Sequence, residues 1–156
     1  MADPVFPPQL PCALREGYGL NHVQPFARTE MVTGRARQRR TFTSVPSTVP
    51  VSWILTGPEA QLFEAWFRYT IQDGTAWFTA QIKSPLDGCE QVSGYRCRFT
   101  EMYSGPELVG RCHWRFRANL EIWERPMLAP GWEQFPDYIL RADIIDLAVN
   151  REWPEA

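Results

Sequence analysis

Lysine is nearly absent from this sequence: Lys83 is the single one among 16 basic residues, and the others are arginines. The planar guanidinium of arginine pairs with carboxylates in a fixed bidentate geometry and loses its water more cheaply than an ammonium group. An arginine bias is typical of proteins that pack against other proteins, although GC-rich coding produces the same bias without a structural reason. The formal net charge of −2 argues against a global attraction to nucleic acid or to an acidic membrane.

Motifs of catalytic and metal sites are also absent. No G-x-S-x-G, H-E-x-x-H or Walker glycine loop occurs. The two histidines, His22 and His113, have no partners at metal-ligand spacing. We therefore expect no enzymatic activity, no cofactor and no metal. No C-x-x-C pair occurs, so we expect reduced thiols, with Cys97 and Cys112 on strand faces as small apolar residues.

Long apolar runs are missing as well. No segment approaches the roughly 18–20 apolar residues of a membrane span. The first residues carry prolines and an acid where a secretory signal needs a basic and then an apolar run. We expect a protein made in the cytoplasm, with no membrane partner.

A strand is the clearest element that the sequence does contain. In Cys112–Trp123, apolar and polar residues alternate strictly, and a period of two places them on opposite faces of a β-strand. The apolar face consists of Cys112, Trp114, Phe116, Ala118, Leu120 and Ile122. Arginines and a carboxylate on the other face can pair with a neighbouring strand or with another subunit.

Four further strands are predicted from alternation and turn residues, at 40–45, 49–55, 76–82 and 92–103. Pro46 and Pro50 must avoid central ladder positions, because proline has no amide hydrogen to donate. The stretch 104–110 contains Gly105 and Pro106 and is interpreted as a turn and a bridge.

A helix is predicted at about Pro58–Gln72. Thr56-Gly57-Pro58-Glu59 matches a capping box at its start. An apolar stripe at helical spacing follows, formed by Leu62, Phe63, Trp66, Phe67 and Ile71. Asp73-Gly74 ends the helix, because glycine readily adopts the left-handed conformation.

Together these elements predict a mainly β domain with one central helix (α+β), built as an antiparallel β-sandwich or curled sheet. Residues 1–34 are expected to form a proline-rich N-terminal arm, 35–125 the core domain, and 126–156 a C-terminal arm. Within that last arm, Tyr138–Val149 is expected to be a short amphipathic helix, or else an extended segment. The apolar residues of both arms lack a visible place in the core, so we expect them to contact other subunits.

Two groups of residues are candidate interface positions. The first is the cluster Arg35, Arg37, Arg39 and Arg40, which has three open interpretations: a solvated or intramolecularly paired strand entry, pairing with carboxylates of another subunit, or phosphate binding. The second is aromatic. Trp66, Trp77 and Trp114 are expected in the core, whereas Trp123, Trp132 and Trp153 are expected at an interface.

The middle of the chain resembles a small structural protein of tailed bacteriophages. The resemblance covers roughly residues 10–125. It rests on Gly34-Arg35-x-Arg37-Gln38-Arg39-Arg40 before two strands, and on Thr56–Ile71 followed by Asp73-Gly74-x-Ala76-Trp77-Phe78. It implies a tail-tube-like fold whose subunits close into a ring, a homohexamer, beneath the tail tube.

The function that this resemblance implies is that of a virion protein joining the tail tube to the baseplate or tail tip. Its partners would be copies of itself, the tail tube protein and baseplate or tail-tip hub proteins, with no specific nucleic acid. Two alternatives stay open: a head–tail joining protein, and a small nucleic-acid-binding β-domain. Location in the virion tail, and in the host cytoplasm during assembly, follows from the same resemblance.

Overall fold

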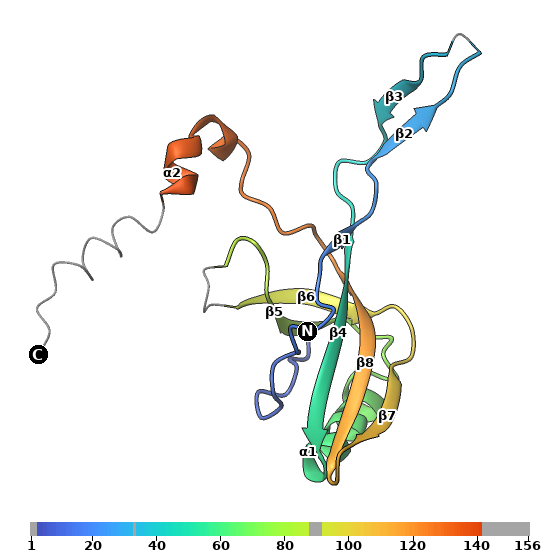
Figure 1. Cartoon of the computed structure of the whole chain (residues 1–156), viewed down its shortest axis with the longest axis vertical. Coiled ribbons are helices and arrows are strands. Elements are labelled where there is room, and N and C mark those ends of the chain that lie inside the picture. The colour runs from blue at the N-terminus through green and yellow to red at the C-terminus, as the bar shows by residue number, and fades with distance from the viewer. Residues whose placement is uncertain (1–2, 33, 88–91, 142–156) are drawn as a thin grey trace, which may run out of the picture. The chain divides into compact units, whose positions relative to one another are not determined.

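The computed structural model describes residues 3–32, 34–87 and 92–141 (Figure 1). Contacts divide the chain into two units, Met1–Pro126 and Met127–Ala156, and each is described by itself. The first unit is mostly antiparallel β-structure. Its strands are β1 Asn21–His22, β2 Phe26–Thr29, β3 Arg37–Arg40, β4 Ser47–Thr56, β5 Phe78–Ile82, β6 Ser93–Phe99, β7 Ser104–Val109 and β8 His113–Ile122.

The main sheet is built around β8. Its strand order is β1-β4-β8-β6-β5, and β7 also pairs with β8. Strand β4 lies along the whole of one side of β8, from Ser47 opposite Ile122 to Thr56 opposite His113. The other side of β8 is shared, with β6 pairing at its C-terminal end and β7 at its N-terminal half. Since β6 and β7 follow one another along one side, the sheet curls, as Figure 1 shows.

Burial in β4 and β8 follows the predicted period of two. In β8, Phe116, Ala118, Leu120 and Ile122 are buried. Two residues at the start of the predicted apolar face differ from the prediction. Cys112 precedes the strand and is exposed, and Trp114 is only half-buried. The strand begins at His113 because the chain is still turning at Cys112.

The predicted helix is confirmed, with one change in its packing. It begins as α1 Gly57–Ala65 and continues as a π-helical turn, η1 Trp66–Thr70. The Thr56 amide donates to Glu59 Oε2 at 2.7 Å, as a capping box requires. Leu62, predicted to pack, is 41% exposed. The other four residues of the predicted stripe, Phe63, Trp66, Phe67 and Ile71, are buried. The π-helical turn widens the helix where Trp66 and Phe67 lie.

The helix ends where the sequence predicts. Gln72, Asp73 and Gly74 all have positive φ, at 52°, 55° and 85°. A side chain at Gly74 would place a Cβ 3.1 Å from the ring of Phe67. Glycine is therefore required there both by conformation and by close packing.

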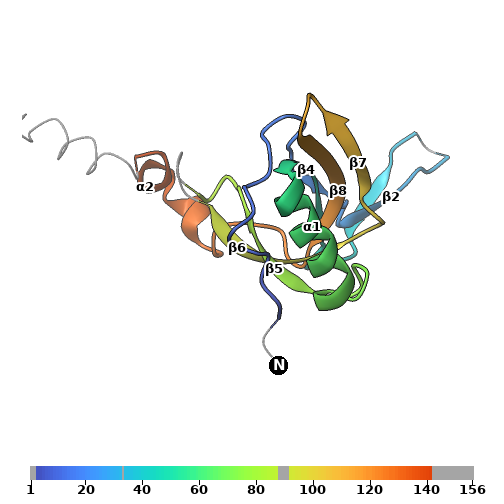
Figure 2. The same cartoon turned by 90° about the horizontal axis from the view of Figure 1, so that it is seen from below.

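The helix lies across one face of the sheet (Figure 2). Its aromatic residues meet those of the strands: Phe63 and Phe116 have ring centroids 5.0 Å apart, and Trp66 meets Phe78 edge-on at 5.0 Å. The buried cluster between helix and sheet is mainly aromatic and aliphatic, and Cys97 also belongs to it.

The N-terminal segment belongs to this core, which corrects the expectation that its apolar residues lack a place in their own domain. The Thr79 amide donates to the Pro4 carbonyl and the Phe6 amide to the Thr79 carbonyl, both at 2.8 Å, so the segment closes the edge of β5. Leu10 is 6% exposed within the core cluster. The Leu14 amide then donates to the Ser52 carbonyl at 2.8 Å, at the free edge of β4. We call residues 4–14 the N-terminal strap.

The expected boundary at residue 34 falls inside a hairpin. Strands β2 and β3 pair antiparallel as a separate two-stranded sheet, with Phe26 opposite Arg40 and Thr29 opposite Arg37. The strand predicted at 40–45 is therefore wrong: pairing ends at Arg40, and the chain then leads irregularly into β4.

Two other strand predictions are refined, and the turn predicted at 104–110 is wrong. The segment predicted as a turn and bridge at 104–110 contains β7, and the strand predicted at 92–103 is the shorter β6. The strand predicted at 76–82 begins two residues later, as β5. Pro50 lies inside β4 opposite Asn119. The backbone of Pro50 points to the same edge of β4 as that of Ser52, which is the edge away from β8. The missing amide hydrogen of Pro50 therefore costs no hydrogen bond with β8.

The second unit contains two short helices among its described residues, a 3-10 turn η2 Trp132–Gln134 and α2 Pro136–Leu140. The helix predicted at Tyr138–Val149 overlaps only the end of α2. Its remainder lies outside the residues that the structure describes.

Candidate interaction surfaces

The arginine cluster lies on the hairpin formed by β2 and β3. Residues opposite one another in an antiparallel pair project from the same face. One face of the hairpin therefore carries Arg37 and Arg39, opposite Thr29 and Ala27, and the other carries Arg28 and Arg40. All four residues of β3 are exposed. The hairpin extends away from the main sheet in both views (Figures 1 and 2).

One arginine of the cluster has a local role. The Arg40 guanidinium donates to the carbonyls of Phe42 at 3.0 Å and Thr43 at 2.8 Å, which fixes the root of the hairpin. Within the described part of the chain, Arg35, Arg37 and Arg39 form no ion pair. Pairing of these three with carboxylates of another subunit stays a prediction.

The hairpin tip is apolar and exposed. Met31 is 52% exposed and Val32 is fully exposed. A two-stranded hairpin is marginally stable on its own in water. Exposed apolar side chains at the end of such a hairpin are typical of a contact with another protein surface.

The polar face of the main sheet carries three ion pairs. Arg98 pairs with Glu121 at 2.6 Å across β6 and β8, Arg117 with Glu107 at 3.2 Å across β8 and β7, and Arg96 with Asp3 at 2.6 Å. The prediction that arginines on the polar face of β8 pair with a neighbouring strand is confirmed by Arg117. Each pair is partly exposed and contributes about 0–1 kcal/mol to stability. The pairs therefore balance charges on this face but stabilise the fold little.

Two tryptophans meet on this polar face. Trp77, just before β5, and Trp123, just after β8, have ring centroids 4.9 Å apart and nearly perpendicular planes. The Arg96 guanidinium lies 5.3 Å from the Trp77 ring and 5.1 Å from the Trp123 ring, and Arg98 lies 4.7 Å from Trp77. Trp77, predicted in the core, is only half-buried, because it points to the face opposite Phe78. Trp123 is 51% exposed, and its place at an interface stays a prediction.

Next to these tryptophans the surface is hollowed by about 420 Å³. The walls are Trp77, Trp123, Val45 and Pro46, with Arg98, Glu121, Glu124 and Ser44 completing them. Glu121 is engaged by Arg98, whereas Glu124 forms no ion pair among the residues described. We call this the Trp77–Trp123 hollow.

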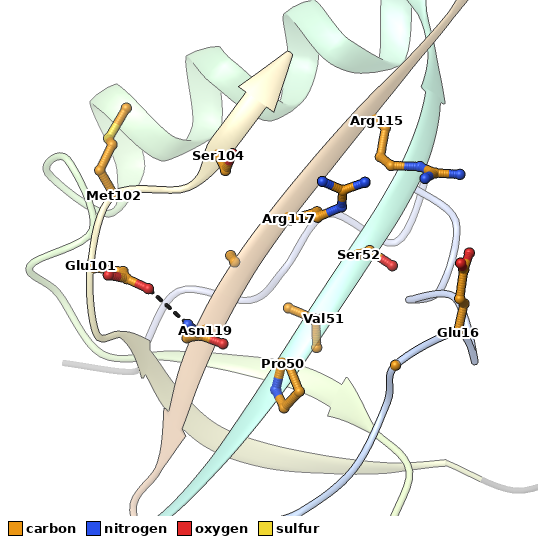
Figure 3. Close-up of a pocket in the computed structure, with 12 residues that line it drawn as sticks. Glu16, Pro50, Val51, Ser52, Glu101, Met102, Ser104, Arg115, Arg117 and Asn119 are labelled. Atoms are coloured by element: carbon orange, nitrogen blue, oxygen red, sulfur yellow. Dashed lines mark hydrogen bonds between the residues drawn. The ribbon is translucent and has the colours of Figure 1, made fainter. Parts of the chain in front are cut away.

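A second hollow, of about 400 Å³, lies on the polar face of β4 and β8 (Figure 3). Arg115 and Arg117 line it together with Glu16 and Glu101, so its walls carry both signs of charge. Figure 3 shows the Asn119 amide directed at Glu101, to which it donates at 2.7 Å. The Arg115 Nε is buried and has no hydrogen-bond partner within the described ranges.

Trp132 lies in the second unit. It is 49% exposed and lines a shallow hollow of about 550 Å³ with Phe135, Tyr138, Pro130 and Gly131. These aromatic rings therefore stay accessible within their own unit. Trp153 lies outside the residues that the structure describes.

Among the residues that the structure describes, neither histidine is hydrogen-bonded to a carboxylate. His22 Nδ1 lies 2.7 Å from the Ser47 hydroxyl, and burial together with the nearby Arg125 charge lowers the pKa of His22. No carboxylate within the described segments is hydrogen-bonded to that ring. His113 is exposed on β8 opposite Thr56. The described residues also contain no cluster of three or more potential metal ligands.

A partly buried polar cluster formed by Ser84, Asp87, Ser93 and Tyr95 was not predicted from the sequence. Asp87 accepts hydrogen bonds from the Ser84 amide at 2.8 Å, from the Ser84 hydroxyl at 3.0 Å and from the Ser93 hydroxyl. Burial alone would raise the pKa of Asp87, but these bonds outweigh it and hold the pKa below its ordinary value. Tyr95 extends the cluster, with its hydroxyl 2.7 Å from that of Ser84. The cluster ties a turn to β6, and the Pro85–Asp87 turn residues were its only signal.

Comparisons with known proteins found no match to this chain among family models, curated proteins or solved structures. Among the helices that the structure describes, none has the length and apolar character needed to cross a membrane.

Proposed function

We propose that this chain is a structural subunit of a bacteriophage tail, a virion protein that forms a homohexameric ring between the tail tube and the baseplate or tail tip. The resemblance of residues 10–125 to small tail proteins motivates the proposal. The observation that carries it is the hairpin of β2 and β3, which extends from the sheet with an exposed apolar tip.

The hairpin fits an assembling subunit for a physical reason. A projecting two-stranded ribbon gains little stability from its own chain. Its unpaired backbone edges and its apolar tip contribute to stability only when a neighbouring molecule pairs with the edges and covers the tip. A ring requires such a feature to contact a different surface on the next copy, since closure of a ring depends on head-to-tail contacts.

The proposal is tested by the mass of the protein in solution, measured by sedimentation velocity across a concentration series, with electron microscopy of the largest species. Phe26 and Arg40 face one another, so replacing residues 27–39 by Asn-Gly closes the hairpin with a two-residue turn and leaves the main sheet intact. We expect rings for the natural chain and monomers for the shortened one. A natural chain that stays monomeric at every concentration contradicts the proposal.

Binding measurements on the same purified protein distinguish this function from the two alternatives, a nucleic-acid-binding domain and a head–tail joining protein. A nucleic-acid-binding domain would bind a labelled single-stranded oligonucleotide with an affinity that falls steeply as salt is added. The polar face opposes that function, because three of its arginines are already paired with carboxylates. A head–tail joining protein would form a ring that binds the head end of the tail and not the baseplate end.

A further inference from the structure

We infer that the Trp77–Trp123 hollow is the receptor for an arginine from the hairpin of a second copy, the contact being made by Arg37 and Arg39. This inference rests on the proposed function and names the surfaces that would meet.

The hollow has the composition of a guanidinium site. A cation near an indole face is attracted by the ring quadrupole, and tryptophan is the best partner among the aromatic side chains. Arg96 and Arg98 already lie 4.7–5.3 Å from these two rings, so guanidinium groups fit this environment. Both are paired with carboxylates at 2.6 Å.

Glu124 is the acidic residue of the hollow that forms no ion pair with the residues described. The walls of the hollow contain one arginine, Arg98, and two carboxylates, Glu121 and Glu124. Since Arg98 and Glu121 neutralise one another, Glu124 gives the hollow a net negative charge. An incoming guanidinium would gain a carboxylate partner and an exposed indole, Trp123, at the same place.

The hairpin supplies the matching cation. Arg37 and Arg39 project from one face of β3, opposite the small residues Thr29 and Ala27, so nothing large beside them shields their guanidinium groups. Neither forms an ion pair with any residue that the structure describes. Arg40, on the other face, is already bonded to backbone carbonyls at the root.

We assign the arginine to a second copy because the hairpin of the same chain extends away from the main sheet, on and beside which most residues of the hollow lie. Its root is fixed by bonds from the amides of Thr41 and Phe42 to the Pro25 carbonyl, at 2.8 and 3.0 Å. From that root the hairpin extends beyond the sheet in both views (Figures 1 and 2). The residues that follow the root, 44–46, line the hollow of the same chain.

A charge swap tests the contact. We expect Glu124→Arg to weaken self-association by about tenfold or more, because it places two like charges together. The double variant Arg37→Glu with Arg39→Glu should weaken it similarly. Combining all three substitutions should restore association toward that of the natural chain, which only a direct contact between these residues predicts.

Arg28→Glu is the control: it makes one Arg-to-Glu change, half the charge change of the double variant, on the opposite face of the hairpin, and should leave association within about threefold of the natural value. Association is measured by sedimentation equilibrium, and circular dichroism checks that every variant is folded. If the natural chain forms rings and Glu124→Arg associates within about threefold of it, or if the triple variant fails to recover, the hollow is not the receptor and the proposed function survives. If the natural chain is monomeric, both proposals fail.

Discussion

Phe6 stacks on Trp53, with ring centroids 5.6 Å apart and planes inclined by 16°. Phe6 also meets Trp66 edge-on at 5.3 Å, so a residue from the proline-rich start of the chain links β4 to the helix. The N-terminal strap is thus part of the hydrophobic core, and its removal should be felt as a loss of stability.

The first prediction concerns that strap. Leu10 is 6% exposed, and Leu10→Ala should lower the free energy of unfolding by about 2–5 kcal/mol, since it leaves a cavity among buried side chains. Urea unfolding followed by circular dichroism measures the change. Pro11→Ala, at the exposed neighbouring position, serves as the control and should change stability by less than about 1 kcal/mol. Equal stabilities for Leu10→Ala and the natural chain would place the strap outside the core.

The helix provides a second test. Trp66 is 6% exposed, so Trp66→Ala should cost roughly 3–5 kcal/mol. Trp66→Phe should cost less, because a ring is retained and because the indole N–H, which lacks a hydrogen-bond partner in the described part of the chain, is removed. Leu62→Ala, at a 41% exposed position of the same helix, is the comparison. A larger loss from Leu62 than from Trp66 would mean that the helix faces the other way.

A third prediction is a pH dependence. Burial raises the pKa of the Cys97 thiol from an ordinary 9.0 to about 12. Above pH 9.0 the unfolded chain loses this proton while the folded chain keeps it, so folding becomes less favourable as pH rises. The contribution is complete below pH 9.0 and declines above it, by up to about 1.4 kcal/mol per pH unit.

Urea unfolding curves at pH values from about 7 to 10 test this for the natural chain and for Cys97→Ala. The slope above pH 9.0 should be shallower in the variant, which has no thiol to ionise there. Tyr18, whose pKa burial raises to about 12, adds a similar slope in both proteins only above its ordinary 10.0. Identical slopes in the two proteins would show that Cys97 is not held neutral.

The fourth prediction is that residues 127–156 are dispensable for folding of the sheet. The contacts of Met1–Pro126 form a unit of their own, so a chain ending at Pro126 should unfold cooperatively with the midpoint of the full chain. Ring formation, if it uses the exposed Trp132, Phe135 and Tyr138, should weaken. A truncated protein without cooperative unfolding would show that the last residues stabilise the sheet.

Some elements could be predicted because a single local pattern determines them. In β8 one face is buried from Phe116 to Ile122, so the period of two is visible in the sequence. Thr56, Glu59 and Gly74 mark the ends of the helix through capping and backbone conformation, which depend only on near neighbours.

Other elements depend on partners distant in the chain and left no local pattern. The edge strand β7 contains Gly105 and Pro106, residues that are typical of turns. Strand β3 is Arg-Gln-Arg-Arg, which has no apolar alternation at all. The Trp77–Trp123 hollow requires β5, β6 and β8 to be in register, so its residues could be named as aromatic or charged but not brought together.

The N-terminal strap has a consequence for synthesis on the ribosome. The segment that closes the edge of β5 is made well before its partner Thr79, and Ser52 emerges between the two. During that interval the strap has no strand to bind, and afterwards the new edges of β4 and β5 are open until it docks. Nascent chains on neighbouring ribosomes can pair through such edges. The proline content of the strap limits that hazard, because a segment with few amide hydrogens is a poor template for a foreign strand.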